Sequence, residues 1–375
     1  IYKLKSIDLF AGCGGLSLGM KQAGIEISLA SDFKEYAAQT YQNFFNEEFI
    51  VDDILSLEEK NWAKIKGFRN KIDIIAGGPP CQGFSNANRQ RIKDDPRNKL
   101  YRSFMSCINF IQPELVLMEN VRGIKKIGSR IIKEFYDIGY RGEFYQLNAK
   151  DFGIPQNRER VFFLFFNEKR FDNIDERLFK FTQLLESKKF KSEPTNLKNA
   201  LYGLPKLQAK TKKNSTTYES KENGFYEICS NKTNNYLKLI NGNKKGKIFN
   251  HMARYNNPRD IEIFGLLPQG ENSLHESIRH LMPYKTRDHI FKDKYYKLDE
   301  NKVCKTITAH MSFDCNMYIH PTQARGLTPR EAARVQSFPD NFEFMGPYTK
   351  WYEQIGNAVP PLLAKKIGEA ILEVS

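Results

Sequence analysis

The sequence predicts an α/β protein built on a parallel β-sheet with helices on both faces. Between about residues 4 and 165, apolar segments of strand length alternate with segments of helical pattern. The strand-like segments are apolar throughout rather than at every second residue, which is typical of strands buried on both faces of a sheet.

The expected elements follow one another along the chain. Strands are expected at 5–10, 25–31, 72–76 and 114–119, with helices at 16–24, 36–45 and 101–112. The apolar run at 161–166 has the length of a strand and is too short to span a membrane. Near the C-terminus, 327–338 predicts a helix with Thr328 as N-cap and Pro329 at its first position, and 360–374 predicts a closing helix.

Composition narrows the class of protein. The chain has 375 residues, of which 40% are hydrophobic, enough for a sizeable core and more than one domain. Lys and Arg outnumber Asp and Glu by 58 to 44, and the net charge of +14 favours a polyanionic partner such as nucleic acid. The start of the sequence has no signal-peptide pattern, so we expect a cytoplasmic protein, associated with the nucleoid in a prokaryote, and no membrane partner.

The six cysteines are scattered, with no C-x-x-C and no paired histidine spacing. This pattern predicts reduced thiols, no disulfide framework and no metal site.

The middle of the chain differs from both ends. From about 170 to 322 it is rich in Lys and Asn and poor in periodicity, and regular patterning returns at about 325. We therefore expect a catalytic and ligand-binding domain at 1–170, a smaller inserted domain at 171–322, and a return to the first domain at 323–375.

Ligands of open parallel sheets bind at the carboxyl ends of the strands. After the first strand, Gly12, Gly14 and Gly15 would let the backbone approach a ligand closely. Ser17 stands where the dinucleotide fingerprint needs a third glycine, which disfavours NAD. The second strand leads to Asp32 and Phe33, which suit ribose hydroxyls and the face of a base, although Asp32 could equally be a helix N-cap.

Two further strand ends carry reactive groups. The stretch "GGPPCQGFS" at 77–85 holds Cys81 on a stiff loop just after a strand, and the strand at 114–119 ends in Glu119. A thiol and a carboxylate would then meet at one rim of the sheet. In "QNRERVFFL", alternation puts Arg158 and Arg160 on one face of a strand; surface ion pairing is the alternative role for both.

These segments together resemble the DNA methyltransferases that act on carbon-5 of cytosine. The matching segments occur in the family's order: "DLFAGCGGLSLG" (8–19), "GGPPCQGFS" (77–85), "ENV" (119–121), "QNRERVFFL" (156–164), "LTPREAARVQSFP" (327–339) and "IGNAVPPLLA" (355–364). The resemblance covers roughly 1–170 and 303–375, and the middle matches less specifically. Asp52 departs from the family pattern, in which many members have glycine.

The resemblance implies a mechanism. The Cys81 thiolate would add to carbon-6 of a cytosine rotated out of duplex DNA, which makes carbon-5 nucleophilic. Glu119 would share a proton with ring nitrogen 3, Arg160 would hold the 2-carbonyl oxygen, and Arg158 would support them.

The resemblance also implies a Rossmann-like, S-adenosylmethionine-dependent sheet with S-adenosylhomocysteine as the product and no metal. The residues expected around the cofactor are Asp8, Phe10, Gly12, Gly14, Gly15, Leu16, Asp32, Phe33, Asp53, Ile54, Gly78, Pro80, Leu100, Asn357 and Ala358. Gln82 and Ser85 are expected at the DNA backbone, and Lys244, Lys245 and Arg254 of the middle region are expected to bind DNA. The inserted domain would recognise the target sequence.

The partner implied by the resemblance is double-stranded DNA. We expect a site-specific monomer that either serves as the modification enzyme of a restriction–modification system or acts as an orphan methylase. A cognate endonuclease would act on the same site without a stable complex.

Two alternatives stay open on the sequence alone. A tRNA methyltransferase shares the fold and nearly all these motifs, but its C-F-T tripeptide is absent here. A catalytically inactive DNA-binding regulator would not need Cys81, Glu119, Arg158 and Arg160, all of which are present.

Overall fold

The computed structural model describes residues 3–80, 96–191, 193–213, 224–242, 246–282 and 294–375, with the side chains of 96–98 also left out. The chain forms two compact units. The first comprises Ile1–Phe152, Arg158–Lys191 and Ala358–Ser375, and the second comprises Gly153–Asn157 and Ser192–Asn357.

The first unit is built on a seven-stranded sheet of order β3-β2-β1-β4-β5-β8-β6. Its strands are β1 (Lys5–Leu9), β2 (Glu26–Asp32), β3 (Glu48–Val51), β4 (Ile74–Gly77), β5 (Leu115–Val121), β6 (Tyr140–Asn148) and β8 (Glu159–Asn167). Strands β3, β2, β1, β4 and β5, which are neighbours in that order, pair in parallel as the sequence predicts. Strand β8 instead runs antiparallel to both of its neighbours, so the sheet is mixed rather than wholly parallel.

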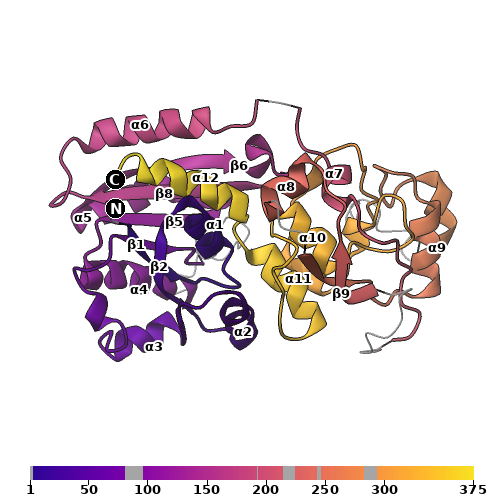
Figure 1. The fold of residues 1–375 in the computed structure, drawn as a ribbon, viewed down its shortest axis with the longest axis horizontal. Coiled ribbons are helices and arrows are strands. Elements are labelled where there is room, and N and C mark those ends of the chain that lie inside the picture. Colours follow the sequence, from indigo (N-terminus) through magenta and orange to yellow (C-terminus); the bar gives the residue numbers. More distant parts are fainter. Residues whose placement is uncertain (1–2, 81–95, 192, 214–223, 243–245, 283–293) are drawn as a thin grey trace. The chain divides into compact units, whose positions relative to one another are not determined.

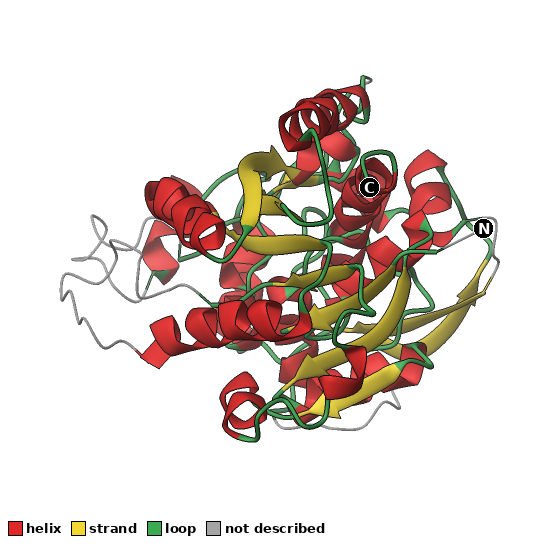
Figure 2. Ribbon diagram, turned by 90° about the vertical axis from the view of Figure 1, so that its left-hand side faces the viewer, coloured by secondary structure: helices red, strands yellow, loops and turns green. Residues whose placement is uncertain are grey.

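Helices cover both faces of this sheet, which confirms the expected α/β architecture (Figures 1 and 2). The helices of the first unit are α1 (Gly15–Ala23), α2 (Glu35–Phe44), α3 (Ile54–Glu59), α4 (Pro96–Ile111), α5 (Gly128–Asp137), α6 (Ile174–Ser187) and α12 (Pro361–Leu372). In Figure 1, α3 and α4 lie below the sheet and α6 lies above it.

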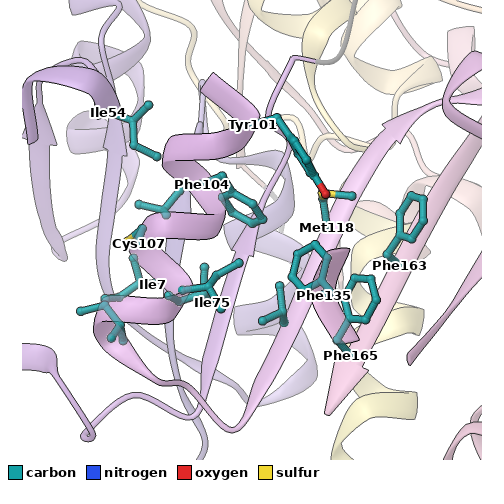
Figure 3. Close-up of a cluster of buried hydrophobic side chains, with 14 of the residues drawn as sticks. Ile7, Ile54, Ile75, Tyr101, Phe104, Cys107, Met118, Phe135, Phe163 and Phe165 are labelled. Carbon is teal, nitrogen blue, oxygen red and sulfur yellow. The ribbon is translucent and has the colours of Figure 1, made fainter. Parts of the chain in front are cut away.

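A hydrophobic core of this unit lies on the α4 face of the sheet (Figure 3). Alternate residues of the strands point into it, among them Ile7, Ile75, Met118 and Phe163. The intervening residues, including Asp8 and Glu119, therefore point to the opposite face.

Helix α1 packs closely against α12. A Cβ atom at Gly19 of α1 would collide with the carbonyl oxygen of Pro361 and with Ala364, and would lie 2.6 Å from the backbone nitrogen of Lys365. The helix ends at Gly24, whose φ of 107° needs glycine, at the position that the sequence predicts.

We expect Gly19→Ala to destabilise the first unit by about 1–3 kcal/mol, because the added methyl group must push α1 and α12 apart. Gly67→Ala is the matched control, since a Cβ atom there meets no heavy atom within 4 Å. Urea unfolding should show a lower midpoint for Gly19→Ala alone. Equal midpoints for the two variants would contradict the close approach of these helices.

Among the described residues, the second unit has less regular secondary structure than the first. Its elements are β7 (Gln156–Asn157), α7 (Leu197–Leu201), β9 (Gly224–Ser230), α8 (Asn235–Asn241), β10 (Gly246–Met252), α9 (Pro258–Leu266), β11 (Cys304–Lys305), α10 (Pro329–Val335) and α11 (Tyr348–Asn357). Strands β9 and β10 form an antiparallel pair, and β11 pairs in parallel with β7. A small core around α9 includes Ile263, Phe264 and Tyr295.

Helix α10 begins as the sequence predicts. Thr328 is its N-cap in a capping box with Glu331, and Pro329 takes the first position. The helix is shorter than expected because it ends at Val335, and Ser337 adopts a φ of 65°.

The compact units divide the chain differently from the expected domains at two places. Residues 171–191, which include α6, belong to the first unit, and residues 323–357 belong to the second. Buried arginines of α10 explain the second difference. Arg330 donates to the carbonyl oxygens of Phe249 and Pro339, and Arg334 donates to that of Ala200, so this helix is tied into the second unit.

Candidate active site

The carboxyl end of β5 carries a partly buried ion pair. Glu119 and Arg160 are diagonal neighbours on one face of the antiparallel β5–β8 pair, in which Val121 lies opposite Arg160. The Arg160 Nε atom lies 3.1 Å from Glu119 Oε1, and both side chains are about 15% exposed or less. The Nη1 group of Arg160 also donates to the Glu159 carbonyl oxygen at 2.7 Å.

Burial raises the pKa of Glu119 above its ordinary value of 4.5, and the positive charges of Arg160 and Arg158 only partly oppose this. Burial also lowers the pKa of Arg160, which the charge of Glu119 opposes. A carboxyl group with a raised pKa can hold a proton at higher pH than usual and share it with a substrate atom.

The backbone leading towards Cys81 lies against this carboxylate. A Cβ atom at Gly78 would lie 3.1 Å from Glu119 Oε2, so glycine allows this approach. Asn120 then donates from Nδ2 to the Pro79 carbonyl oxygen at 2.8 Å, while its Oδ1 accepts from the Val121 backbone nitrogen at 3.0 Å. The thiol expected at this rim therefore follows a backbone segment fixed beside Glu119.

Three sequence-predicted residues of this loop, Cys81, Gln82 and Ser85, lie outside the described residues. The other five cysteines are described, and none is in a disulfide. Four of them are buried, and burial raises the pKa of Cys13 and Cys304 to about 12 and also raises the pKa of Cys107 and Cys315. These four are poor thiolate nucleophiles.

Arg158 is 1% exposed and lies just before β8. Its backbone nitrogen donates to Asn148 Oδ1 at 3.0 Å, and its Nη2 group donates to the Ala358 carbonyl oxygen at 3.0 Å. The side chain thus ties the start of β8 to the segment before α12 and contributes positive charge near Glu119.

A glycine loop follows β1. Phe10 adopts a φ of 59° and Gly12 a φ of 54°, and nothing lies within 4 Å of where a Cβ of Gly12 would be. A Cβ atom at Gly14, whose φ is 97°, would instead contact the rings of Tyr41 and Phe45 at 2.6–2.9 Å. Glycine is therefore needed for conformation at Gly12 and also for space at Gly14.

The end of β2 faces this loop. One carboxylate oxygen of Asp32 accepts from the backbone nitrogen of Gly12 at 3.0 Å, and the other accepts from that of Lys34 at 2.9 Å. Burial raises the pKa of Asp32. The neighbouring Phe33 is 60% exposed, which leaves its ring open to a planar ligand.

Asp8 lies beneath the glycine loop. It is 1% exposed and accepts from the Ser17 hydroxyl at 2.6 Å through Oδ2, while its Oδ1 has no hydrogen-bond partner within the described part of the chain. Burial raises its pKa to about 7, and the charge of Asp32 adds to this rise against the Ser17 hydrogen bond.

The other residues expected around a cofactor have varied surroundings. Asp53 is the N-cap of α3 and accepts from the Leu55 backbone nitrogen at 3.0 Å. Buried residues of the set are Gly15, Leu16 and Ile54, and partly buried ones are Gly78, Pro80, Leu100 and Ala358. Asn357 ends α11 in the second unit and is exposed.

Of the residues expected to bind DNA in the middle region, Lys244 and Lys245 lie outside the described residues. Arg254 is described, and its guanidinium donates to the carbonyl oxygens of Met311 and Phe313 at 2.7 and 2.8 Å. These bonds engage both Nη groups of Arg254 with backbone rather than leaving them for a phosphate group.

The described residues contain no candidate for a membrane span or for a metal site. No helix among them is long and apolar enough to cross a membrane. No cluster of three or more His, Cys, Asp or Glu side chains there could hold a metal ion.

Sequence reasoning missed two supporting side chains, Asn120 and Asn148. Asn120 appears in the "ENV" segment beside Glu119, but only the fold shows that it holds the Pro79 carbonyl. Asn148 ends β6, an antiparallel strand without a distinctive motif, and nothing in the sequence connects it to Arg158.

The chain is similar to known proteins along nearly its whole length. Residues 4–373 match the family model described as C-5 cytosine-specific DNA methylase. The chain is 36% identical over 391 residues to the Type II methyltransferase M.DdeI of Desulfomicrobium norvegicum, covering 97% of this chain and 88% of that protein. It is 30% identical over 382 residues to the Type II methyltransferase M1.HphI of Haemophilus parahaemolyticus, covering 99% and 87%.

Solved structures show the same fold. A crystal structure described as a candidate DNA modification methyltransferase encoded within an E. coli prophage superposes with a TM-score of 0.75 at 29% identity, covering 99% of each chain. The Dnmt2 methyltransferase of S. pombe shares the fold with a TM-score of 0.58 at 16% identity, covering 99% of this chain and 98% of that one. On its family match and its relatives, this chain belongs to the C-5 cytosine-specific DNA methylase family.

Proposed function

We propose that this protein transfers a methyl group from S-adenosylmethionine to carbon-5 of a cytosine rotated out of duplex DNA, through a covalent adduct with Cys81. One observation carries the proposal. The backbone just before Cys81 is held beside the partly buried Glu119–Arg160 pair by Gly78 and the Asn120–Pro79 hydrogen bond.

The residues at this edge suit the charge changes of the reaction. Adding a Cys81 thiolate to carbon-6 places negative charge on the ring, which Glu119 relieves by sharing its proton with ring nitrogen 3. Arg160 holds the 2-carbonyl oxygen, and Arg158 keeps β8 in place and adds positive charge. Rotation of the base costs a few kcal/mol, because carbon-6 cannot be reached inside the duplex.

The glycine loop suits the cofactor. Open space over Gly12, the exposed ring of Phe33 and the Asp32 carboxylate fit the methionine part, the adenine and the ribose of S-adenosylmethionine. The unpartnered Asp8 oxygen below the loop also suits a ligand rich in donors. When bound, S-adenosylmethionine supplies the electrophilic methyl group that carbon-5 takes.

We further propose a biological setting. Because the relatives are named Type II methyltransferases, we infer that this protein marks one DNA sequence against a restriction endonuclease that cuts the same site, without a stable complex between them. We expect a monomer that meets chromosomal DNA in the cytoplasm. Residues 171–322 would contain the groups that select the sequence, and Lys244 and Lys245 of this region would bind the DNA backbone without selecting it.

The test is expression in a host that lacks cytosine methylation, followed by bisulfite sequencing of its DNA. We expect one short sequence to be protected from conversion at every occurrence. A parallel assay with labelled S-adenosylmethionine offers duplex DNA or tRNA. Transfer to tRNA alone, or to neither substrate, would contradict the proposal in favour of the RNA enzyme or the inactive regulator.

A further inference from the structure

Phe313 of the second unit is unusually exposed. It follows the short 3-10 helix Ala309–Ser312, and its side chain is 77% exposed, the largest fraction for any large apolar residue within the described ranges. One exposed apolar side chain is ordinary by itself. The surroundings of Phe313, however, indicate a binding role.

The backbone that presents this ring is clamped by Arg254. The guanidinium donates to the carbonyl oxygens of Met311 at 2.7 Å, Ser312 at 3.5 Å and Phe313 at 2.8 Å, and to Cys315 Sγ at 3.4 Å. Arg254 also lies over the ring of Tyr352, 5.6 Å from its centroid. A planar group with five donors can hold several carbonyls in one arrangement, which an ammonium group cannot do.

The turn is also fixed from the side of α11. A Cβ atom at Gly356 would collide with the backbone of Thr308 and Ala309, so glycine lets the turn rest directly on the helix. The Phe313 backbone nitrogen donates to the His310 carbonyl oxygen at 2.9 Å. The exposed ring is therefore carried on an ordered turn, and its placement costs little entropy when a partner binds.

An open depression of about 590 Å³ adjoins the turn. Its lining includes Lys305, Thr306, Thr308, His310 and Tyr318. The Lys305 ammonium lies over the rings of Tyr296 and Tyr318, at 5.0 and 5.5 Å from their centroids. His310 also faces the Asp314 carboxylate at 3.9 Å. The exposed lining of the depression, which also includes Asn157 and Met317, is mostly apolar. A lysine above aromatic rings and a second, projecting aromatic ring beside it suit a charged backbone with stacked bases.

We propose that Phe313 is an aromatic wedge that stacks on a base of the bound DNA duplex, and that Arg254 is the positioning residue that presents it. The depression containing Lys305 faces the adjoining sugar–phosphate backbone. This inference rests on the proposed function, because it assumes that DNA is the substrate. Under this proposal Arg254 does not contact DNA as the sequence predicts. It holds the turn that carries the contacting residue, Phe313.

The first experiment measures equilibrium binding to a duplex carrying the sequence mapped by bisulfite sequencing. We expect Phe313→Ala to weaken binding about 5- to 100-fold, the range of one lost base–aromatic stack. Phe313→Leu should also weaken it, whereas Phe313→Tyr should bind like the unchanged protein. Phe179→Ala on α6 is the matched control, since Phe179 is 66% exposed, and it should bind normally. Normal binding by Phe313→Ala would overturn the proposal.

The second experiment tests the clamp. Arg254→Lys keeps the positive charge but cannot span the three carbonyls, so it should weaken binding nearly as much as Phe313→Ala. The double variant should bind no more weakly than Phe313→Ala alone, because both changes remove the same contact. If Arg254 instead contacted a DNA phosphate group directly, Arg254→Lys would bind DNA nearly normally. Additive losses, or a lowered melting temperature that accounts for the loss, would also overturn the positioning role.

These experiments also distinguish a failure of the proposed function from a failure of the role proposed for Phe313. A protein that binds DNA and methylates none refutes the chemistry, and the Phe313→Ala comparison on an unmodified plasmid fragment then decides the wedge. Full methylation with normal binding by Phe313→Ala refutes only the wedge.

Discussion

Cys81→Ser is expected to lower methyl transfer to duplex DNA by at least about a thousand-fold, with folding unchanged. At neutral pH a serine hydroxyl is far too weakly nucleophilic to add to carbon-6 of cytosine, and the nucleophile of an enzyme acts with its neighbours as a unit. The rate is measured with labelled S-adenosylmethionine and a duplex carrying the mapped sequence. Thermal unfolding of the variant should match that of the unchanged protein.

Cys229→Ser is the matched control, because Cys229 is the exposed cysteine of the described residues. It should keep full activity. Turnover by Cys81→Ser at the unchanged rate would refute covalent catalysis at this position. The four buried cysteines are less useful as controls, since a hydroxyl in place of each thiol would disturb packing.

Glu119→Gln is expected to slow the chemical step about 100-fold or more while changing DNA affinity only a few-fold. Glutamine keeps the size of the side chain, but it cannot share an acidic proton with the ring as negative charge develops. Single-turnover rates at saturating DNA separate this effect from binding. Glu159→Gln is a suitable control, because Glu159 pairs with the exposed Arg122 at 2.9 Å.

The pH dependence of the single-turnover rate gives a second test of the role of Glu119. Burial raises its pKa above 4.5, so the protonated form persists to higher pH and is lost as pH rises through the raised pKa. If the protonated form is the active one, the single-turnover rate should fall over that interval, and Glu119→Gln should show no such fall. Equal losses in rate and in affinity would instead indicate a structural carboxylate.

The sequence predicts the glycine loop, the helix end at Gly24 and the capped start of α10, because each depends on residues close together in the chain. The strands β1, β2, β4 and β5 are predictable for a similar reason, since continuous apolar runs mark buried parallel strands. β3 spans four residues only, and no periodicity identifies it.

The meeting of Glu119 and Arg160 could not be derived from pattern alone. Arg160 lies near the start of its strand and Glu119 near the end of its own. In a wholly parallel sheet, these two positions would lie at opposite edges. They meet because β8 runs antiparallel to β5, and this reversal depends on distant contacts that alternation does not encode.

Arg254 shows a second limit of sequence reasoning. A basic residue among lysines and aromatics predicts a DNA contact, and composition cannot reveal that its guanidinium is held by backbone carbonyls more than fifty positions later in the chain. Likewise, arginine side chains are mostly exposed in proteins. Arg330 and Arg334 are nevertheless buried, and their hydrogen bonds hold α10 in the second unit.

The most direct test of the account is trapping of the covalent intermediate. A duplex with 5-fluorocytosine at the mapped position is incubated with the protein and S-adenosylmethionine, and the product is analysed by denaturing electrophoresis and peptide mass spectrometry. Fluorine cannot leave carbon-5 as the proton does, so the adduct cannot resolve. Covalent catalysis by Cys81 predicts a denaturation-resistant complex that carries the transferred methyl group on the ring, with the DNA attached at Cys81, and no complex with Cys81→Ser. Attachment at another cysteine, or normal methylation of the cytosine duplex with no trapped complex, would contradict it.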